Sequence, residues 1–91
     1  MPKILVVDDD AIFRKVLSNL LISHGYKVVL AEHGEEALEI LQATGGSFDL
    51  MISDVSMEPM DGMELLQRAR ALFPDLGVVM LTGHATVDMA V

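Results

Sequence analysis

The stretch Phe48-Asp49-Leu50-Met51-Ile52-Ser53-Asp54 decides the fold of this chain, because it is a short, mostly apolar run that ends on a carboxylate. A run of this length bounded by turn residues predicts a strand buried on both faces. Asp54 then lies at the carboxyl end of that strand, where open parallel sheets place their ligand sites. Aspartate also begins turns, so this stretch by itself leaves two interpretations of Asp54 open.

The composition bounds the class of protein. The chain has 91 residues, enough for one small domain. Hydrophobic residues make up 52% of it, which excludes a disordered acidic tail in spite of the formal net charge of -8. With 6 Lys and Arg against 14 Asp and Glu, no basic run could neutralise a row of phosphates, so we predict that this domain binds no nucleic acid. Cysteine is absent, which argues against a disulfide framework and thiolate chemistry.

Neither a targeting segment nor a membrane segment is predicted. The start of the chain, Met1-Pro2-Lys3, runs straight into strand-like sequence and lacks the long apolar core of a signal peptide. Apolar runs stay well short of the ~20 residues that a helix needs to cross a bilayer. The sequence therefore predicts a cytoplasmic domain with no membrane partner, formed by residues 1–91 as a single unit.

Four short apolar runs alternate with segments of helical periodicity. The predicted strands are residues 4–7, 28–31, 48–54 and 78–81. The inward stripe of the first amphipathic helix is formed by Phe13, Val16, Leu17, Leu20 and Leu21. Asp10 is the predicted N-cap of this helix and Gly25 the residue beyond its end. Further helices are predicted from Gly34 and from Asp61, the last one ending at Pro74. Such alternation with short links predicts an α/β fold with a parallel sheet and helices on both faces.

The carboxyl ends of parallel strands share one edge of the sheet, so acidic residues from distant parts of the sequence should meet there. That edge collects Asp8 and Asp9 after the first strand and Asp54 after the third, with Thr82 after the fourth. Three crowded carboxylates repel one another, which should raise the pKa of at least one. A divalent cation removes this conflict, and hard oxygen ligands suit Mg²⁺, or Mn²⁺ as the alternative. Capping of the following helix explains Asp10 but not the two acids before it.

Four motifs occur in a characteristic order along the chain. They are Val6-Val7-Asp8-Asp9, the pattern Ala31-x-x-Gly34-x-Glu36-Ala37-Leu38, Asp54 followed by Met57 and Asp61-Gly62, and Leu81-Thr82-Gly83. In this order and spacing, from residue 3 to the end, the chain resembles the receiver domain of two-component response regulators. The resemblance implies a flavodoxin-like, doubly wound parallel sheet with strand order 2-1-3-4.

The resemblance also implies a role for each site residue. Asp54 would be the phosphoacceptor, taking a phosphoryl group from a phosphohistidine of a sensor histidine kinase. Asp9, Asp54 and the backbone carbonyl of Ser56 would bind Mg²⁺, with Asp8 contributing through water. Thr82 would be the switch hydroxyl that hydrogen-bonds the new phosphoryl group. A domain of this kind is a signalling domain rather than an enzyme, and the ending at 85–91 resembles receivers attached to transcriptional activators.

The sequence departs from the family in two places. Glu58 stands four residues after the phosphoacceptor, where the family typically has proline, and we expect its side chain to point outward. A receiver normally continues through a fourth helix, a fifth strand and a fifth helix, and that strand carries a lysine that pairs with the phosphoryl group. We therefore predict a receiver truncated before its fifth strand. The exposed edge of the strand at 78–81 then predicts self-association into a homo-oligomer.

Two other functions remain open from the sequence. Without the family lysine, the chain could be a non-switching interaction module that binds partners or self-associates without productive phosphorylation. A phosphatase of the haloacid-dehalogenase type would need a second aspartate two residues after the nucleophile, where this chain has Ser56. The sequence therefore favours the phosphoacceptor receiver, with the interaction module as its alternative.

Overall fold

The computed structural model describes residues 2–81 of the chain. The strands are β1 (Lys3–Val7), β2 (Lys27–Ala31), β3 (Leu50–Asp54) and β4 (Gly77–Leu81), and the helices are α1 (Ala11–Ser23), α2 (Gly34–Ala43) and α3 (Gly62–Leu72). The strands form one sheet in the order β2-β1-β3-β4, and all neighbours in it are parallel. The predicted α/β fold and strand order are confirmed, and each of these strands ends at the residue that the sequence predicted.

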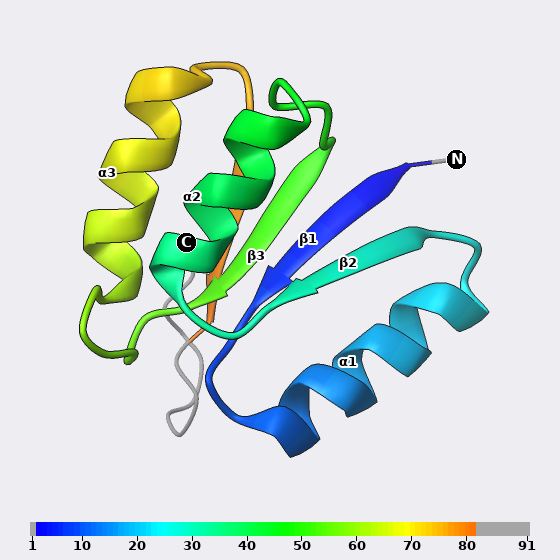
Figure 1. The fold of residues 1–91 in the computed structure, drawn as a ribbon. Coiled ribbons are helices and arrows are strands. Elements are labelled where there is room, and N and C mark those ends of the chain that lie inside the picture. The colour runs from blue at the N-terminus through cyan, green and yellow to red at the C-terminus, as the bar shows by residue number, and fades with distance from the viewer. Residues whose placement is uncertain (1, 82–91) are drawn as a thin grey trace.

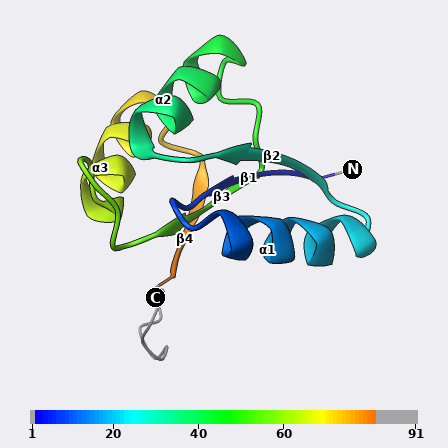
Figure 2. The same ribbon diagram turned by 60° about the horizontal axis from the view of Figure 1, so that its bottom comes forward.

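The sheet separates the helices into two layers. α1 lies on one face, and α2 and α3 pack side by side on the other (Figures 1 and 2). The main core fills the space between the sheet and these last two helices. Its largest fully buried members include Leu5, Leu41, Met51 and Leu65. Burying a leucine of this kind stabilises the fold by about 1.5–3 kcal/mol relative to leaving it exposed. Among residues 2–81, no helix is long and apolar enough to cross a membrane.

Local capping signals set the ends of the helices. The Asp10 carboxylate accepts hydrogen bonds from two backbone N–H groups of the first turn of α1, at 2.9 and 3.2 Å. Gly25 follows α1 with a φ of +91°, a conformation that glycine adopts without strain. Asp61 accepts a hydrogen bond from the backbone N–H of Glu64 at 2.8 Å and so caps α3. These caps confirm the predicted starts of α1 and α3 and the predicted end of α1.

The apolar stripe of α1 is the part of the fold that the sequence predicted least well. Val16 and Leu20, both expected to face the core, are 60% and 53% exposed. α1 packs against β2 and β1, at one side of the sheet. Only part of its stripe therefore meets the sheet within residues 2–81. Periodicity showed that one side of the helix is apolar, but the position of the helix on the sheet decides how much of that side is buried.

Candidate metal centre at the carboxyl end of the sheet

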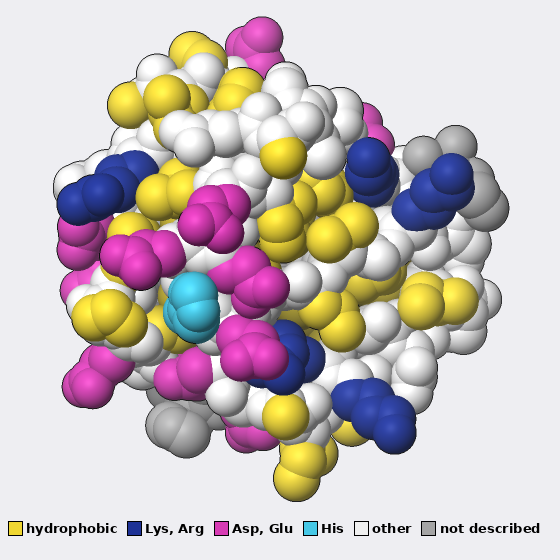
Figure 3. Space-filling view, viewed as in Figure 1, with side chains coloured by type: hydrophobic (Ala, Val, Ile, Leu, Met, Phe, Trp, Pro, Cys, Tyr) yellow, Lys and Arg dark blue, Asp and Glu magenta, His cyan; other side chains and the backbone are white. Residues whose placement is uncertain are grey.

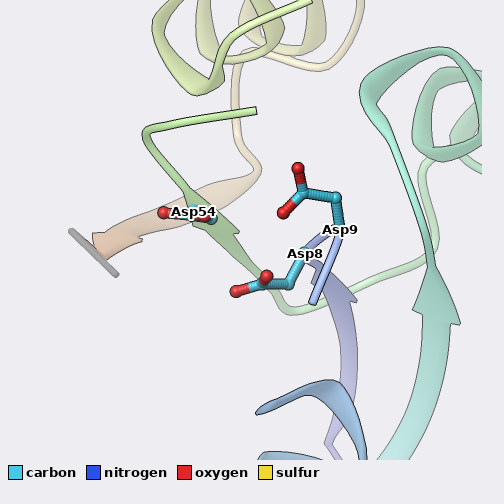
Figure 4. Close-up of side chains that lie close together, drawn as sticks. All are labelled: Asp8, Asp9 and Asp54. Atoms are coloured by element: carbon cyan, nitrogen blue, oxygen red, sulfur yellow. The ribbon is translucent and has the colours of Figure 1, made fainter. Parts of the chain in front are cut away.

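Three aspartates meet where β1 and β3 end. Asp8 and Asp9 follow β1 directly, and Asp54 is the last residue of β3 (Figure 4). β1 and β3 are adjacent parallel strands, so their carboxyl ends lie side by side. One carboxylate oxygen from each aspartate lies within 4.8 Å of those of the other two. Asp8 and Asp54 are buried, whereas Asp9 is exposed. The structure thus brings together the three carboxylates that are far apart in the sequence.

Hydrogen bonds hold the backbone on both sides of this cluster. The backbone N–H of Asp8 donates to the carbonyl of Ala31 at 3.2 Å, which ties the end of β1 to the end of β2. At the end of β3, the backbone N–H of Ser56 donates to Asp54 Oδ1 at 3.2 Å. The buried Ser53 hydroxyl donates to the Asp54 carbonyl at 3.1 Å. The backbone at this edge of the sheet is therefore held in place by hydrogen bonds on both sides of the site.

The pKa of Asp8 is raised above its ordinary value of 3.8, mainly because burial disfavours the charged carboxylate. The negative charges of Asp54, Asp9 and Asp10 raise it further, while a hydrogen bond from the backbone N–H of Asp10 lowers it. The sequence predicted a raised pKa from mutual repulsion alone. The direction is confirmed, but burial is the larger cause, and sequence spacing does not reveal it.

The donor set fits a small, hard divalent cation. All three side chains of the cluster are carboxylates, which are the ligands that Mg²⁺ and Mn²⁺ prefer. Further acidic side chains gather on the surface over the first half of α2 and the carboxyl ends of the strands (Figure 3). Their summed negative potential favours the approach of a cation to this end of the molecule.

We expect Asp8→Asn to stabilise the fold at pH 7 in the presence of EDTA, by about 0.5–2 kcal/mol, the usual range for a single stabilising substitution. A raised folded-state pKa means that Asp8 favours folding most below pH 3.8, and that this contribution is lost as the pH rises through its folded value. Asparagine stays neutral and can still accept the hydrogen bond from Asp10. Urea unfolding followed by circular dichroism measures the effect.

The control for this change is Asp75→Asn, which removes the same charge from an exposed loop outside the cluster. The gain in Asp8→Asn should shrink toward zero as the pH is lowered to 3.8, because Asp8 becomes protonated in the parent. An Asp8→Asn variant that is less stable than the parent at pH 7 in EDTA would contradict this account.

A comparison with known protein families identifies the family of this chain. The chain matches the model of the response regulator receiver domain over residues 4–91. The chain belongs to this family. It is 42% identical over 88 residues to the transcriptional regulatory protein GlrR of Escherichia coli K12, and 40% identical over 89 residues to the response regulator protein FleR of Pseudomonas aeruginosa. These alignments cover 97% and 98% of this chain but only 19% and 18% of the relatives, so the receiver spans about a fifth of their length.

Solved receiver structures share the fold. A response regulator receiver domain protein from Clostridium thermocellum superposes with a TM-score of 0.87 at 32% identity, covering 90% of this chain and 65% of that one. The response regulator TrrA of Thermotoga maritima, solved in complex with Mg²⁺ and BeF, gives a TM-score of 0.84 at 36% identity, covering 93% of this chain and 72% of its own. The predicted resemblance is therefore confirmed at the level of family and fold.

The structure gives the positions of some, but not all, of the other residues that the sequence singled out. Ser56 is exposed beside the cluster, and its backbone N–H contacts Asp54. The Glu58 side chain is exposed, as predicted. Thr82 lies outside the described residues. Lys3 begins β1 at the opposite end of the sheet, where its ammonium lies 4.9 Å from the centre of the Phe48 ring, so this lysine does not belong to the site.

Two polar residues near the site have contacts that the sequence did not reveal: His33 was interpreted as a surface loop residue, and Arg14 was not singled out. His33 caps α2, since its Nδ1 accepts a hydrogen bond from the backbone N–H of Glu36 at 3.2 Å. Arg14 reaches from α1 to the carbonyl oxygen of Asp8 at 2.7 Å. A basic residue one turn after the acidic N-cap was the available signal for Arg14. The direction in which the Arg14 side chain points, however, depends on the packing of α1 against the strands.

Proposed function

We propose that this receiver is the phosphoacceptor of a two-component phosphorelay and takes a phosphoryl group from a sensor histidine kinase on Asp54. The observation that carries the proposal is the position of Asp54 at the end of β3, with a carboxylate oxygen within 4.8 Å of oxygens of both Asp8 and Asp9. Membership of the receiver family supports it. In this proposal, residues 1–91 belong to one receiver domain.

The proposed step is a direct transfer. A carboxylate oxygen of Asp54 attacks the phosphorus of the donor phosphohistidine, the P–N bond breaks, and its electron pair returns to the imidazole. The product is an aspartyl phosphate. Asp8, Asp9, Asp54 and the carbonyl of Ser56 would hold Mg²⁺, or Mn²⁺, which when bound neutralises charge on the phosphoryl oxygens. The role of Thr82 as the hydroxyl that then hydrogen-bonds the phosphoryl group is part of the proposal and rests on the sequence alone.

A specific observation favours a second candidate, a non-switching interaction module. Within residues 2–81, β4 pairs with β3 and is an outer strand of the sheet. Val79, in the middle of β4, is an exposed apolar side chain. Exposed apolar edge strands template pairing with another chain. In this second candidate function, two receivers would associate with each other through β4.

Incubation with acetyl phosphate separates the two functions. With Mg²⁺ present, intact-protein mass spectrometry should show one phosphoryl group added to the parent chain, and with EDTA none, since the charge at the site is then not neutralised. Hydroxylamine should remove the group, because it cleaves acyl phosphates and leaves phosphate esters intact. Mg²⁺ binding in calorimetry without any gain in mass would support the interaction module. Absence of Mg²⁺ binding would contradict the metal centre itself.

A further inference from the structure

Arg14 is a cation enclosed beside an acidic site. It lies at the end of the first turn of α1, and its side chain is only 14% exposed. Its Nη1 donates to the backbone carbonyl of Asp8 at 2.7 Å, and its Nη2 lies 3.9 Å from Glu32 Oε2, just after β2. The guanidinium thus connects α1 to the loops that follow β1 and β2. The transfer step described above makes no use of it.

The bond to the Asp8 carbonyl bears on the geometry of the metal centre. β1 ends at Val7, so the sheet ladder does not hold Asp9, and the Asp8–Asp9 peptide sets the direction of its side chain. That region is held by the bond from the Asp8 N–H to Ala31 and by the bond from the Asp10 N–H to Asp8 Oδ1. Arg14 supplies the bond on the carbonyl side. A planar guanidinium keeps such a bond in one orientation.

We propose that Arg14 is a positioning residue that holds the Asp8–Asp9 peptide in the orientation in which both carboxylates bind a divalent cation. The inference rests on the proposed function, since it concerns the same metal centre. Charge and geometry act in opposite directions here. A guanidinium close to a cation site repels the cation, so removing its charge alone would tighten Mg²⁺ binding. Removing the hydrogen bond should weaken Mg²⁺ binding, because the carboxylates lose their preset arrangement.

Two variants separate these effects. Arg14→Met removes the charge and the hydrogen bond, whereas Arg14→Lys keeps the charge and loses the planar fork. If Arg14 holds the Asp8–Asp9 peptide in place, the Mg²⁺ dissociation constant should rise about 10–100-fold in Arg14→Met and should also rise in Arg14→Lys. The constant is measured by calorimetry on the 91-residue chain, at a temperature where circular dichroism shows each variant folded. In both Arg14 variants, the rate of phosphorylation by acetyl phosphate at saturating Mg²⁺ should be close to that of the parent.

Arg68→Met is the matched control. Like Arg14, Arg68 forms an ion pair with a glutamate, in this case Glu64, but it is 57% exposed on α3 and makes no contact with the cluster among the described residues. Its Mg²⁺ dissociation constant should equal that of the parent. An unchanged or lower dissociation constant in both Arg14 variants would overturn the inference and leave the proposed function intact. If Arg14→Met does not fold, Arg14→Lys decides alone. A parent chain that binds no Mg²⁺ would refute both proposals together.

Discussion

Asp54→Asn is expected to take up no phosphoryl group from acetyl phosphate under conditions in which the parent chain is phosphorylated in the presence of Mg²⁺. The amide keeps the shape of the carboxylate, but it is not a nucleophile and carries no charge for a cation to pair with. The loss should therefore be close to complete, about a thousandfold or more in rate, as for other removals of a reacting group. Intact-protein mass spectrometry over time measures it.

The fold should survive this substitution. The negative charge of Asp54 contributes to the raised pKa of Asp8, so removing it relieves repulsion within the cluster. Urea unfolding in EDTA should show Asp54→Asn to be at least as stable as the parent. Asp75→Asn, which loses the same charge in an exposed loop, should be phosphorylated like the parent. An Asp54→Asn variant that gains phosphate as fast as the parent would place the accepting group elsewhere in the chain.

Gly62→Ala is expected to destabilise the fold by about 3 kcal/mol, at the upper end of the usual cost of overpacking. A Cβ atom at this position would lie inside van der Waals contact with the backbone carbonyl oxygen of Asp54 and 2.8 Å from the Cα of Val55. Backbone atoms cannot move aside as a flexible side chain can. The backbone N–H of Gly62 also donates to the Val55 carbonyl at 2.9 Å, which draws the start of α3 against the end of β3.

Helix propensity predicts the opposite sign for this change. Gly62 is the first residue of α3, and alanine is a better helix former than glycine by about 1 kcal/mol. The steric cost should exceed this gain. Urea unfolding of Gly62→Ala beside Met63→Ala, an exposed neighbour expected to change stability by no more than about 0.5 kcal/mol, tests the balance. A Gly62→Ala variant as stable as the parent would show that the α3 start can shift away from Asp54.

Much of the site could be predicted because its members stand at strand ends. Asp8, Asp9 and Asp54 follow apolar runs that were recognisable as strands, and parallel strands present their carboxyl ends at one edge. The same argument could not reveal that Asp8 is 4% exposed while Asp9 is open to solvent, since burial depends on neighbouring loops. It also could not reveal the contact of Arg14 with Asp8, because that side chain crosses from a helix to a loop.

The sequence by itself determined the order of strands and helices, the caps at Asp10 and Asp61, and the membership of the receiver family. The elements and caps depend on periodicity and turn chemistry, which act over a few residues, and the family membership depends on the order and spacing of motifs along the chain. Only the tertiary structure decided the exposure of the α1 stripe, the role of burial in the pKa of Asp8, and the close approach of Gly62 to Asp54. Each of these depends on how separate elements pack together, and packing is a property of three-dimensional neighbours rather than of sequence neighbours.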